Sequence, residues 1–246
     1  MNLKRYVFLA VATLCLAGSF FLPNIVAGVM DARRLDNVIA VDAESISIST
    51  DDPALDLPER IKLVSSPNTE MLALTTGLAM GTETAKTRAM RELGRFFRGS
   101  YFEFEVNGCT VEDYSILFVI DAEDPTANII IWELKIIDQH HNEALVSIDD
   151  ETGMILKLIY QLGDGRFRPA GSSGGEADSS LEDDIHAAAL ELAEAMTAYY
   201  RMQVSLGDYE FSGNMAYYRG EMQGAGEAVP MYGVVRANSF TMNERV

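Results

Sequence analysis

The sequence predicts an α+β protein: an N-terminal transmembrane helix followed by an ectodomain of one or two units, each built from a helix and an antiparallel sheet. Three observations support this expectation: a long apolar run near the start, helical apolar spacing ahead of each later group of strands, and period-two alternation within those strands. The chain has 246 residues, of which 48% are apolar. This composition excludes a chain that is mainly disordered.

The first predicted element is the apolar run of residues 6–30, which follows Lys4 and Arg5 and ends before Asp31. A helix of this length would extend about 37 Å, which is enough to cross a hydrocarbon core of ~30 Å. Secretory signals have shorter apolar regions, of about 7–15 residues. We therefore expect an uncleaved single-pass anchor with a short cytoplasmic tail within residues 1–34, and a cleaved signal peptide is the alternative.

The charge of the chain bears on its location and its partners. The 19 basic and 37 acidic residues give a formal net charge of −18. A nucleic-acid partner is not expected, because such proteins need a basic face to neutralise phosphates. The five-residue basic tail favours the cytoplasmic side, so we expect the membrane to be contacted through residues 6–30 and residues 35–246 to be extracytoplasmic.

The ectodomain is expected to begin with a polar juxtamembrane stalk at residues 35–55. Asp56, with Pro58 and Glu59 behind it, is a helix-start signal for a short helix that ends near Val64. Residues 69–81 fit either a helix or a strand.

A domain is expected over residues 56–162, and most of its elements follow residue 82. Apolar residues at helical spacing predict a helix over residues 84–98, which should cover the sheet that follows. Alternating apolar residues predict strands at residues 101–106, 114–121, 130–136, 145–148 and 154–160.

The remainder is expected to form a second helix and a hairpin. Residues 163–180 are rich in glycine and serine and are interpreted as a flexible linker or a long surface loop. Residues 181–202 carry an apolar stripe at helical spacing, and strands are predicted at 214–222 and 229–241. We expect residues 181–246 to pack on the first half, as a small second domain or as a continuation of the first sheet.

Two segments carry a resemblance to a known family. Residues 132–137 read WELKII, and residues 145–156 read LVSIDDETGMIL. With the preceding helix, this stretch resembles a PepSY-type domain over about residues 82–161, here in a membrane-anchored protein of bacterial type. In such a hairpin the aspartates would cap the turn and Gly153 would adopt a positive φ. The resemblance implies an extracytoplasmic module that binds or restrains proteases or other envelope enzymes, and it implies no catalytic residues.

Other candidate chemistry is interpreted as structural. Adjacent His140 and His141 lie in an expected turn, and Cys109 is interpreted as a small buried residue rather than a nucleophile. The acids within 121–124 and 149–151 do not match a calcium-binding loop, so we interpret them as turn caps. The chain contains no GxSxG, HExxH, P-loop or GxGxxG pattern. We therefore expect no enzyme activity, catalytic residue, metal or cofactor.

The candidate binding residues are four arginines in the helix predicted over residues 84–98. Arg88, Arg91, Arg95 and Arg98 are spaced i, i+3, i+7 and i+10, which places them on one helical face. They could form a solvated face that pairs with the acidic remainder of the fold. The alternative is a docking stripe for an anionic partner or envelope polymer.

Together these features predict a non-catalytic, membrane-anchored, extracytoplasmic module that inhibits or senses an envelope protein. The alternative is a structural component of an envelope assembly, in which the helix–sheet units associate with each other.

Overall fold

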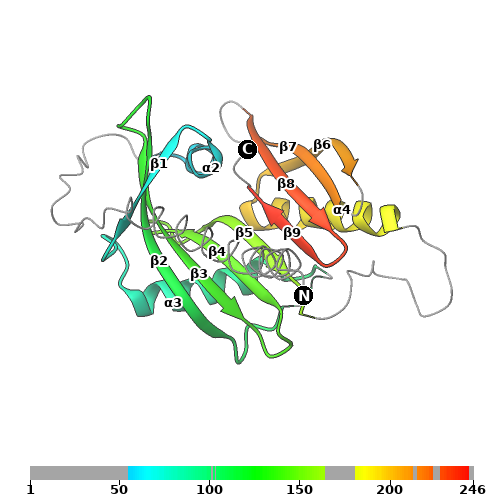
Figure 1. The fold of residues 1–246 in the computed structure, drawn as a ribbon, viewed down its shortest axis with the longest axis horizontal. Helices are drawn as coiled ribbons and strands as arrows, with labels where there is room; N and C mark the ends of the chain where they lie inside the picture. Colours follow the sequence, from blue (N-terminus) through cyan, green and yellow to red (C-terminus); the bar gives the residue numbers. More distant parts are fainter. Residues whose placement is uncertain are drawn as a thin grey trace, which may run out of the picture. The chain divides into compact units, whose positions relative to one another are not determined.

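The computed structural model describes residues 55–100, 102, 104–163, 181–212, 215–223 and 228–243, all of which belong to one unit spanning Val41–Val246. These residues form three helices and nine strands (Figure 1). The helices are α2 (Leu57–Ser65), α3 (Thr82–Phe96) and α4 (Leu181–Tyr200). The strands are β1 (Thr69–Leu74), β2 (Thr110–Asp121), β3 (Asn128–Ile137), β4 (Glu143–Asp149), β5 (Ile155–Gln161), β6 (Gln203–Ser212), β7 (Met215–Gln223), β8 (Val229–Arg236) and β9 (Ser239–Met242).

All nine strands belong to one sheet with the order β1-β2-β3-β4-β5-β9-β8-β7-β6. Every neighbouring pair is antiparallel. The strands before and after α4 join where β5 pairs with β9, from Leu158 opposite Met242 to Gln161 opposite Ser239. The C-terminal strands therefore continue the first sheet.

The helices cover both faces of this sheet. Helix α3 contacts β3, β4 and β5, and it also contacts α4, which lies against β6, β7 and β8. Arg60 of α2 forms hydrogen bonds with Asp149, which is paired with Ile131 of β3. Lys86 of α3 lies over the ring of Tyr114, which is paired with Leu134 of β3. Because Ile131 and Leu134 point to opposite faces of their strand, α2 and α3 lie on opposite faces of the sheet.

Local sequence signals explain where the helices form. Asp56 and Glu59 form a reciprocal capping box at the start of α2, which confirms the helix-start signal there. In α4, Ile185, Leu192 and Tyr199 of the predicted apolar stripe are at most 4% exposed. Burial of this stripe supplies the main stabilisation of α4 against the sheet.

Residues 102–109 differ from the prediction. The alternation of Phe102, Phe104 and Val106 predicts a strand, but the described residues of this segment adopt no regular secondary structure. Phe102 and Phe104 instead pack against the ring of Tyr160. An alternating pattern also suits an irregular segment whose aromatic side chains fill a core beneath the end of a helix.

The carboxylate of Asp138 holds this irregular segment beside the β3–β4 turn. It accepts hydrogen bonds from the backbone N–H groups of Glu105, His140 and Asn142 and from the side-chain amide of Asn142. Burial raises the pKa of Asp138, but these hydrogen bonds outweigh it and hold that pKa below its ordinary value.

The expected fold class is wrong for the described residues. A single nine-stranded antiparallel sheet with three helices replaces an anchored ectodomain built from helix–sheet units. Continuity through β5 and β9 is a long-range pairing that local periodicity does not reveal. No helix among the described residues is long and apolar enough to cross a membrane. The anchor predicted at 6–30, the stalk up to residue 54, and residues 164–180 of the predicted linker lie outside the described residues.

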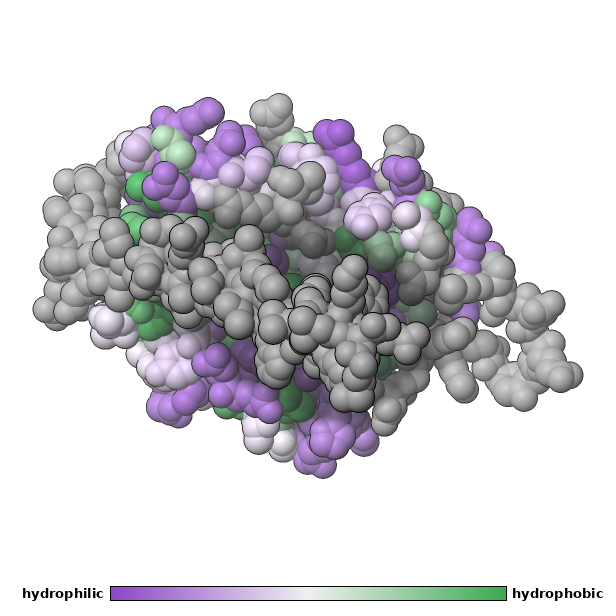
Figure 2. All heavy atoms as spheres, in the orientation of Figure 1, coloured by the Kyte–Doolittle hydropathy of each residue, from purple (hydrophilic) through white to green (hydrophobic). Residues whose placement is uncertain are grey.

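Figure 2 shows where polar side chains gather on the visible face. Hydrophilic residues occupy much of the visible outline of the described part of the chain, and hydrophobic ones form small patches between them. The large apolar side chains that are most exposed include Leu78, Leu190 and Tyr217, on separate elements. Single exposed apolar residues of this kind are ordinary in folded proteins.

Replacing Asp138 with asparagine should lower stability in a pH-dependent way. Because the pKa of the folded form is depressed, the stabilisation is present above the unfolded value near 3.8 and is lost as the pH falls through the lower folded value. Urea unfolding should therefore show a deficit for Asp138→Asn at pH 7 that shrinks at pH 3. Glu70→Gln, at an exposed site on β1, is the control. An equal deficit at both pH values would contradict this assignment.

Candidate functional site

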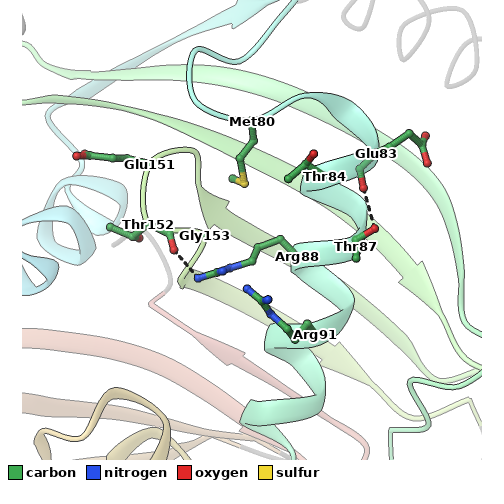
Figure 3. A pocket seen from close by; sticks show the side chains of 9 residues that line it. All are labelled: Met80, Glu83, Thr84, Thr87, Arg88, Arg91, Glu151, Thr152 and Gly153. Atoms are coloured by element: carbon green, nitrogen blue, oxygen red, sulfur yellow. Dashed lines mark hydrogen bonds between the residues drawn. The ribbon is translucent and has the colours of Figure 1, made fainter.

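An open groove lies between the first turns of α3 and the turn that joins β4 to β5. Its volume is about 580 Å³, within the range typical of ligand pockets. Figure 3 shows the side chains of Arg88 and Arg91 extending from α3 toward this turn, with Met80 pointing into the space between them. The lining residues are Met80, Glu83, Thr84, Thr87, Arg88, Arg91, Glu151, Thr152 and Gly153.

One wall of the groove is the β4–β5 turn, which the sequence fixes locally. The buried carboxylate of Asp149 accepts hydrogen bonds from the backbone N–H and the hydroxyl of Thr152, and Gly153 adopts a φ of +70°. These features confirm the predicted turn capping and positive φ. Asp149 also pairs with Arg60 of α2, whose Nη1 donates hydrogen bonds to both carboxylate oxygens at 2.8 and 3.0 Å. The turn is thus connected to the helix on the opposite face of the sheet.

The next carboxylate, Asp150, fixes the loop that leads into α3. It accepts hydrogen bonds from the backbone N–H groups of Leu78, Ala79 and Met80 at 2.6–3.1 Å, and from the indole N–H of Trp132 at 2.6 Å. Asp150 is 4% exposed, so these four donors satisfy a carboxylate that is shielded from water. This network places Met80 at the edge of the groove.

Arg88 lies directly on the turn. Its Nη2 donates a hydrogen bond to the carbonyl oxygen of Thr152 at 2.7 Å (Figure 3). A Cβ atom at Gly153 would lie 2.3 Å from Arg88 Nε, so the close approach requires glycine there. Arg88 Nε also lies 3.2 Å from Glu92 Oε1, within the same helix. Arg88 therefore joins α3 to the β4–β5 turn.

The centre of the arginine cluster is Glu92, whose side chain is fully buried. Its carboxylate lies 3.2 Å from Arg88, 3.4 Å from Arg91 and 2.8 Å from Arg95. The hydroxyl of Tyr199 in α4 donates a hydrogen bond to Glu92 Oε2 and accepts one from the backbone N–H at the start of β5. Burial, together with the nearby Glu92 carboxylate, raises the pKa of Tyr199, so this hydroxyl keeps its proton. Glu92 thus connects α3, α4 and β5.

Arg91 is the most exposed arginine of the three that contact Glu92. Its side chain is 56% exposed, compared with 31% for Arg88 and 42% for Arg95. Its one ion pair among the described residues runs through Nε to Glu92, which leaves the two terminal nitrogens directed away from that contact. One carboxylate faces three guanidinium groups, so the cluster keeps an excess of positive charge.

The four arginines predicted as binding residues do not all lie at the groove. Arg88 and Arg91 line the groove. Arg95 lies beside it, bonded to Glu92 and positioned over the ring of Tyr199. Arg98 is exposed and lies two residues beyond the end of α3, outside the groove. The helical face of the predicted stripe is therefore interrupted after Arg95, because the helix ends at Phe96.

The two acidic residues of the groove are engaged elsewhere. Glu83 forms an ion pair with Lys86 at 3.0 Å, and Glu151 forms one with Arg60. Figure 3 shows both carboxylates pointing away from the guanidinium groups. No histidine or cysteine lines the groove among the described residues, and the hydroxyl of Thr87 donates a hydrogen bond to the backbone carbonyl of Glu83. The arrangement is suited to holding an anionic group.

The other candidate residues have local roles. His140 is exposed and lies 3.4 Å from Glu105, and His141 occupies the turn before β4 with a φ of +59°. Cys109 is half-buried, and burial with the carboxylates of Asp138 and Glu105 raises its pKa to about 11. A thiol with this pKa is protonated at neutral pH and is a poor nucleophile. No cluster of metal-ligating side chains occurs within the part of the chain that is described.

Sequence reasoning missed several residues that build this site. Glu92 lies one residue after Arg91 and at helical spacing from Arg88 and Arg95, so the i−4 and i+3 rule could have identified it as their common partner. Met80 and Thr84 carry no local signal. They reach the groove because Asp150, distant in sequence, fixes the loop before α3.

Replacing Glu92 with alanine should destabilise the fold by on the order of 1–3 kcal/mol. The change leaves three guanidinium groups without their shared carboxylate and removes the acceptor for Tyr199, while the arginines regain solvent. Glu92→Gln should cost less, because the amide oxygen still accepts hydrogen bonds. Urea unfolding measures both effects, and an equal or smaller loss for alanine than for glutamine would refute the role of Glu92 as a shared hydrogen-bond acceptor.

Gly153→Ala should cost more stability than Gly99→Ala. Both glycines have a positive φ, which costs roughly 1 kcal/mol for alanine, but only the Cβ at Gly153 meets Arg88. In an Arg88→Ala background the cost at Gly153 should fall to that at Gly99. Thermal unfolding of these variants tests the contact, and an unchanged cost without Arg88 would disprove it.

Comparison with family models, curated proteins and solved structures found no match to this chain. The resemblance of residues 82–161 to a PepSY-type domain therefore stays a prediction.

Proposed function

We propose that this protein is a non-catalytic binding module that acts outside the cytoplasm and regulates a protein of the cell envelope. The groove between α3 and the β4–β5 turn is the proposed binding site. The observation that carries this proposal is the exposed guanidinium group of Arg91, held by a buried carboxylate that two other arginines share.

The groove has the properties of a prepared binding site. Its walls are fixed by Asp149, Asp150 and Glu92, which are at most 4% exposed and make hydrogen bonds or ion pairs to separate elements. Fixed walls lower the ordering cost of binding, because fewer side chains lose freedom when a ligand arrives. The electrostatic preference is for an anion, because the groove acids pair with Lys86 and Arg60.

The proposed location rests on the sequence. The apolar segment of residues 6–30 supports placement at the cell membrane, and the resemblance to PepSY-type domains agrees with a role in restraining or sensing a partner. The groove also suits a non-catalytic role, because among the described residues no histidine or cysteine lines it and its two glutamates are engaged in ion pairs.

Site-specific photo-crosslinking in intact cells tests this proposal. A photoreactive residue at Thr84, which lines the groove, should form an adduct with one extracytoplasmic protein that mass spectrometry identifies. The same residue at Arg98, which is exposed outside the groove, is the matched control and should not form that adduct.

Charge reversal provides the second half of this test. Arg91→Glu should reduce the Thr84 adduct at least fivefold, while Arg98→Glu, with the same change in net charge, should leave it unchanged. An adduct that is insensitive to Arg91→Glu, or that contains only cytoplasmic proteins, would contradict the proposal. An adduct with a second copy of this chain would favour an envelope assembly and also contradict regulation of another protein.

A further inference from the structure

The groove offers an anion two kinds of donor beside an apolar contact. Arg91 presents terminal guanidinium nitrogens, and Thr84 presents an exposed hydroxyl at the first turn of α3. The first turn of α3 begins after Gly81 without a side-chain cap, so its backbone N–H groups add partial positive charge. Met80 supplies a flexible apolar surface at the same site.

Two buried polar atoms beside the groove are incompletely satisfied. Arg88 Nε and Glu92 Oε1 are 3.2 Å apart, but neither has a hydrogen bond of good geometry. Buried polar atoms are usually hydrogen-bonded, so atoms without such a bond need an explanation, and a functional site is one. Glu92 Oε1 also lies 3.4 Å from Nε of Arg91, which lines the groove.

The surrounding charge limits the size of the anion. The chain carries a formal net charge of −18, so an extended polyanion would meet repulsion beyond the groove. A single carboxylate interacts mainly with groups inside one Debye length, about 8 Å at physiological salt. A guanidinium group binds a carboxylate through two parallel hydrogen bonds, which favours this group over a diffuse charge.

We propose that the groove recognises an acidic side chain of a partner polypeptide, with an apolar residue of the same segment lying against Met80. This inference rests on the proposed function and specifies its ligand. The carboxylate binds the terminal nitrogens of Arg91, while Arg88, bonded to the carbonyl oxygen of Thr152, forms the adjacent wall of the groove. A volume of about 580 Å³ admits a few residues of an extended segment.

This ligand class can be tested with a displayed library of random peptides, from which those that bind the full-length chain are selected. The recovered peptides should be enriched in aspartate or glutamate next to leucine, isoleucine, methionine or phenylalanine. Arg91→Ala should abolish this enrichment, and the matched control Arg98→Ala should retain it. A preference for basic or neutral peptides, no enrichment, or the same enrichment with Arg91→Ala would overturn the inference. Thermal unfolding verifies that both variants fold.

Affinity measurements on the most enriched peptide separate a peptide site from a simple anion site. Exchange of its acid for the matching amide should weaken binding at least tenfold, and a change below twofold would overturn the inference. Inorganic phosphate and succinate should compete only at far higher concentration than the peptide. Equal competition by phosphate would identify an anion site without peptide recognition, which also overturns the inference.

The two proposals can fail separately. The Thr84 crosslink reports a partner whatever its charge, whereas the peptide selection reports the chemistry of the recognised segment. A specific crosslinked envelope protein without enrichment of acidic peptides would refute the ligand class alone. Loss of both results would refute the binding site itself.

Discussion

A single buried carboxylate, that of Glu92, organises the side of the fold where the groove lies. It contacts three arginines of α3 and accepts a hydrogen bond from Tyr199 of α4, which in turn binds the start of β5. A buried charge without partners costs free energy, so these contacts must form together when α3 and α4 pack on the sheet. The same requirement fixes the arginine side chains and leaves Arg91 directed toward solvent.

The β4–β5 turn supplies the complementary constraint. Asp149 and Asp150 are adjacent in the sequence, but they serve opposite sides of the sheet: one binds Arg60 of α2 and the other binds the loop before α3. A short DDETG segment therefore holds two distant parts of the chain, α2 and the loop before α3, beside the β4–β5 turn. The groove lies where this turn meets the arginine cluster, so its shape follows from two sets of buried carboxylates.

The sequence predicted the elements whose signals are local. The helix start at Asp56, the hairpin turn with Gly153 and the apolar stripe of α4 were predicted because each depends on residues that are close together in the sequence. The pairing of β5 with β9 was not predicted, because strands separated by a helix and a long segment carry no local mark of their partner. Strand β6 was missed because its QVSLGDYEFS sequence shows weak alternation.

The candidate site was predicted only in part, and for a similar reason. The spacing of Arg88, Arg91 and Arg95 gave the correct face of one helix, but the end of α3 at Phe96 removed Arg98 from it. The sequence left two hypotheses open for these arginines: a solvated face that pairs with the acidic remainder of the fold, or a docking stripe for an anionic partner. The structure shows a third case, in which Glu92 of the same helix shares its charge among them. Long-range contacts of Asp150 decide which other residues complete the groove.

The most direct test of this account is the hydrogen exchange of the arginine Nε–H groups, measured by NMR on the full-length chain. Signals can be assigned by replacing each arginine with lysine. The account predicts slower exchange for Arg88 and Arg91, whose Nε atoms lie 3.2 and 3.4 Å from Glu92 Oε1, than for Arg98, and acceleration of both by Glu92→Gln. Equal exchange of these three arginines, unaffected by Glu92→Gln, would show that Glu92 does not hold the cluster and would contradict the account.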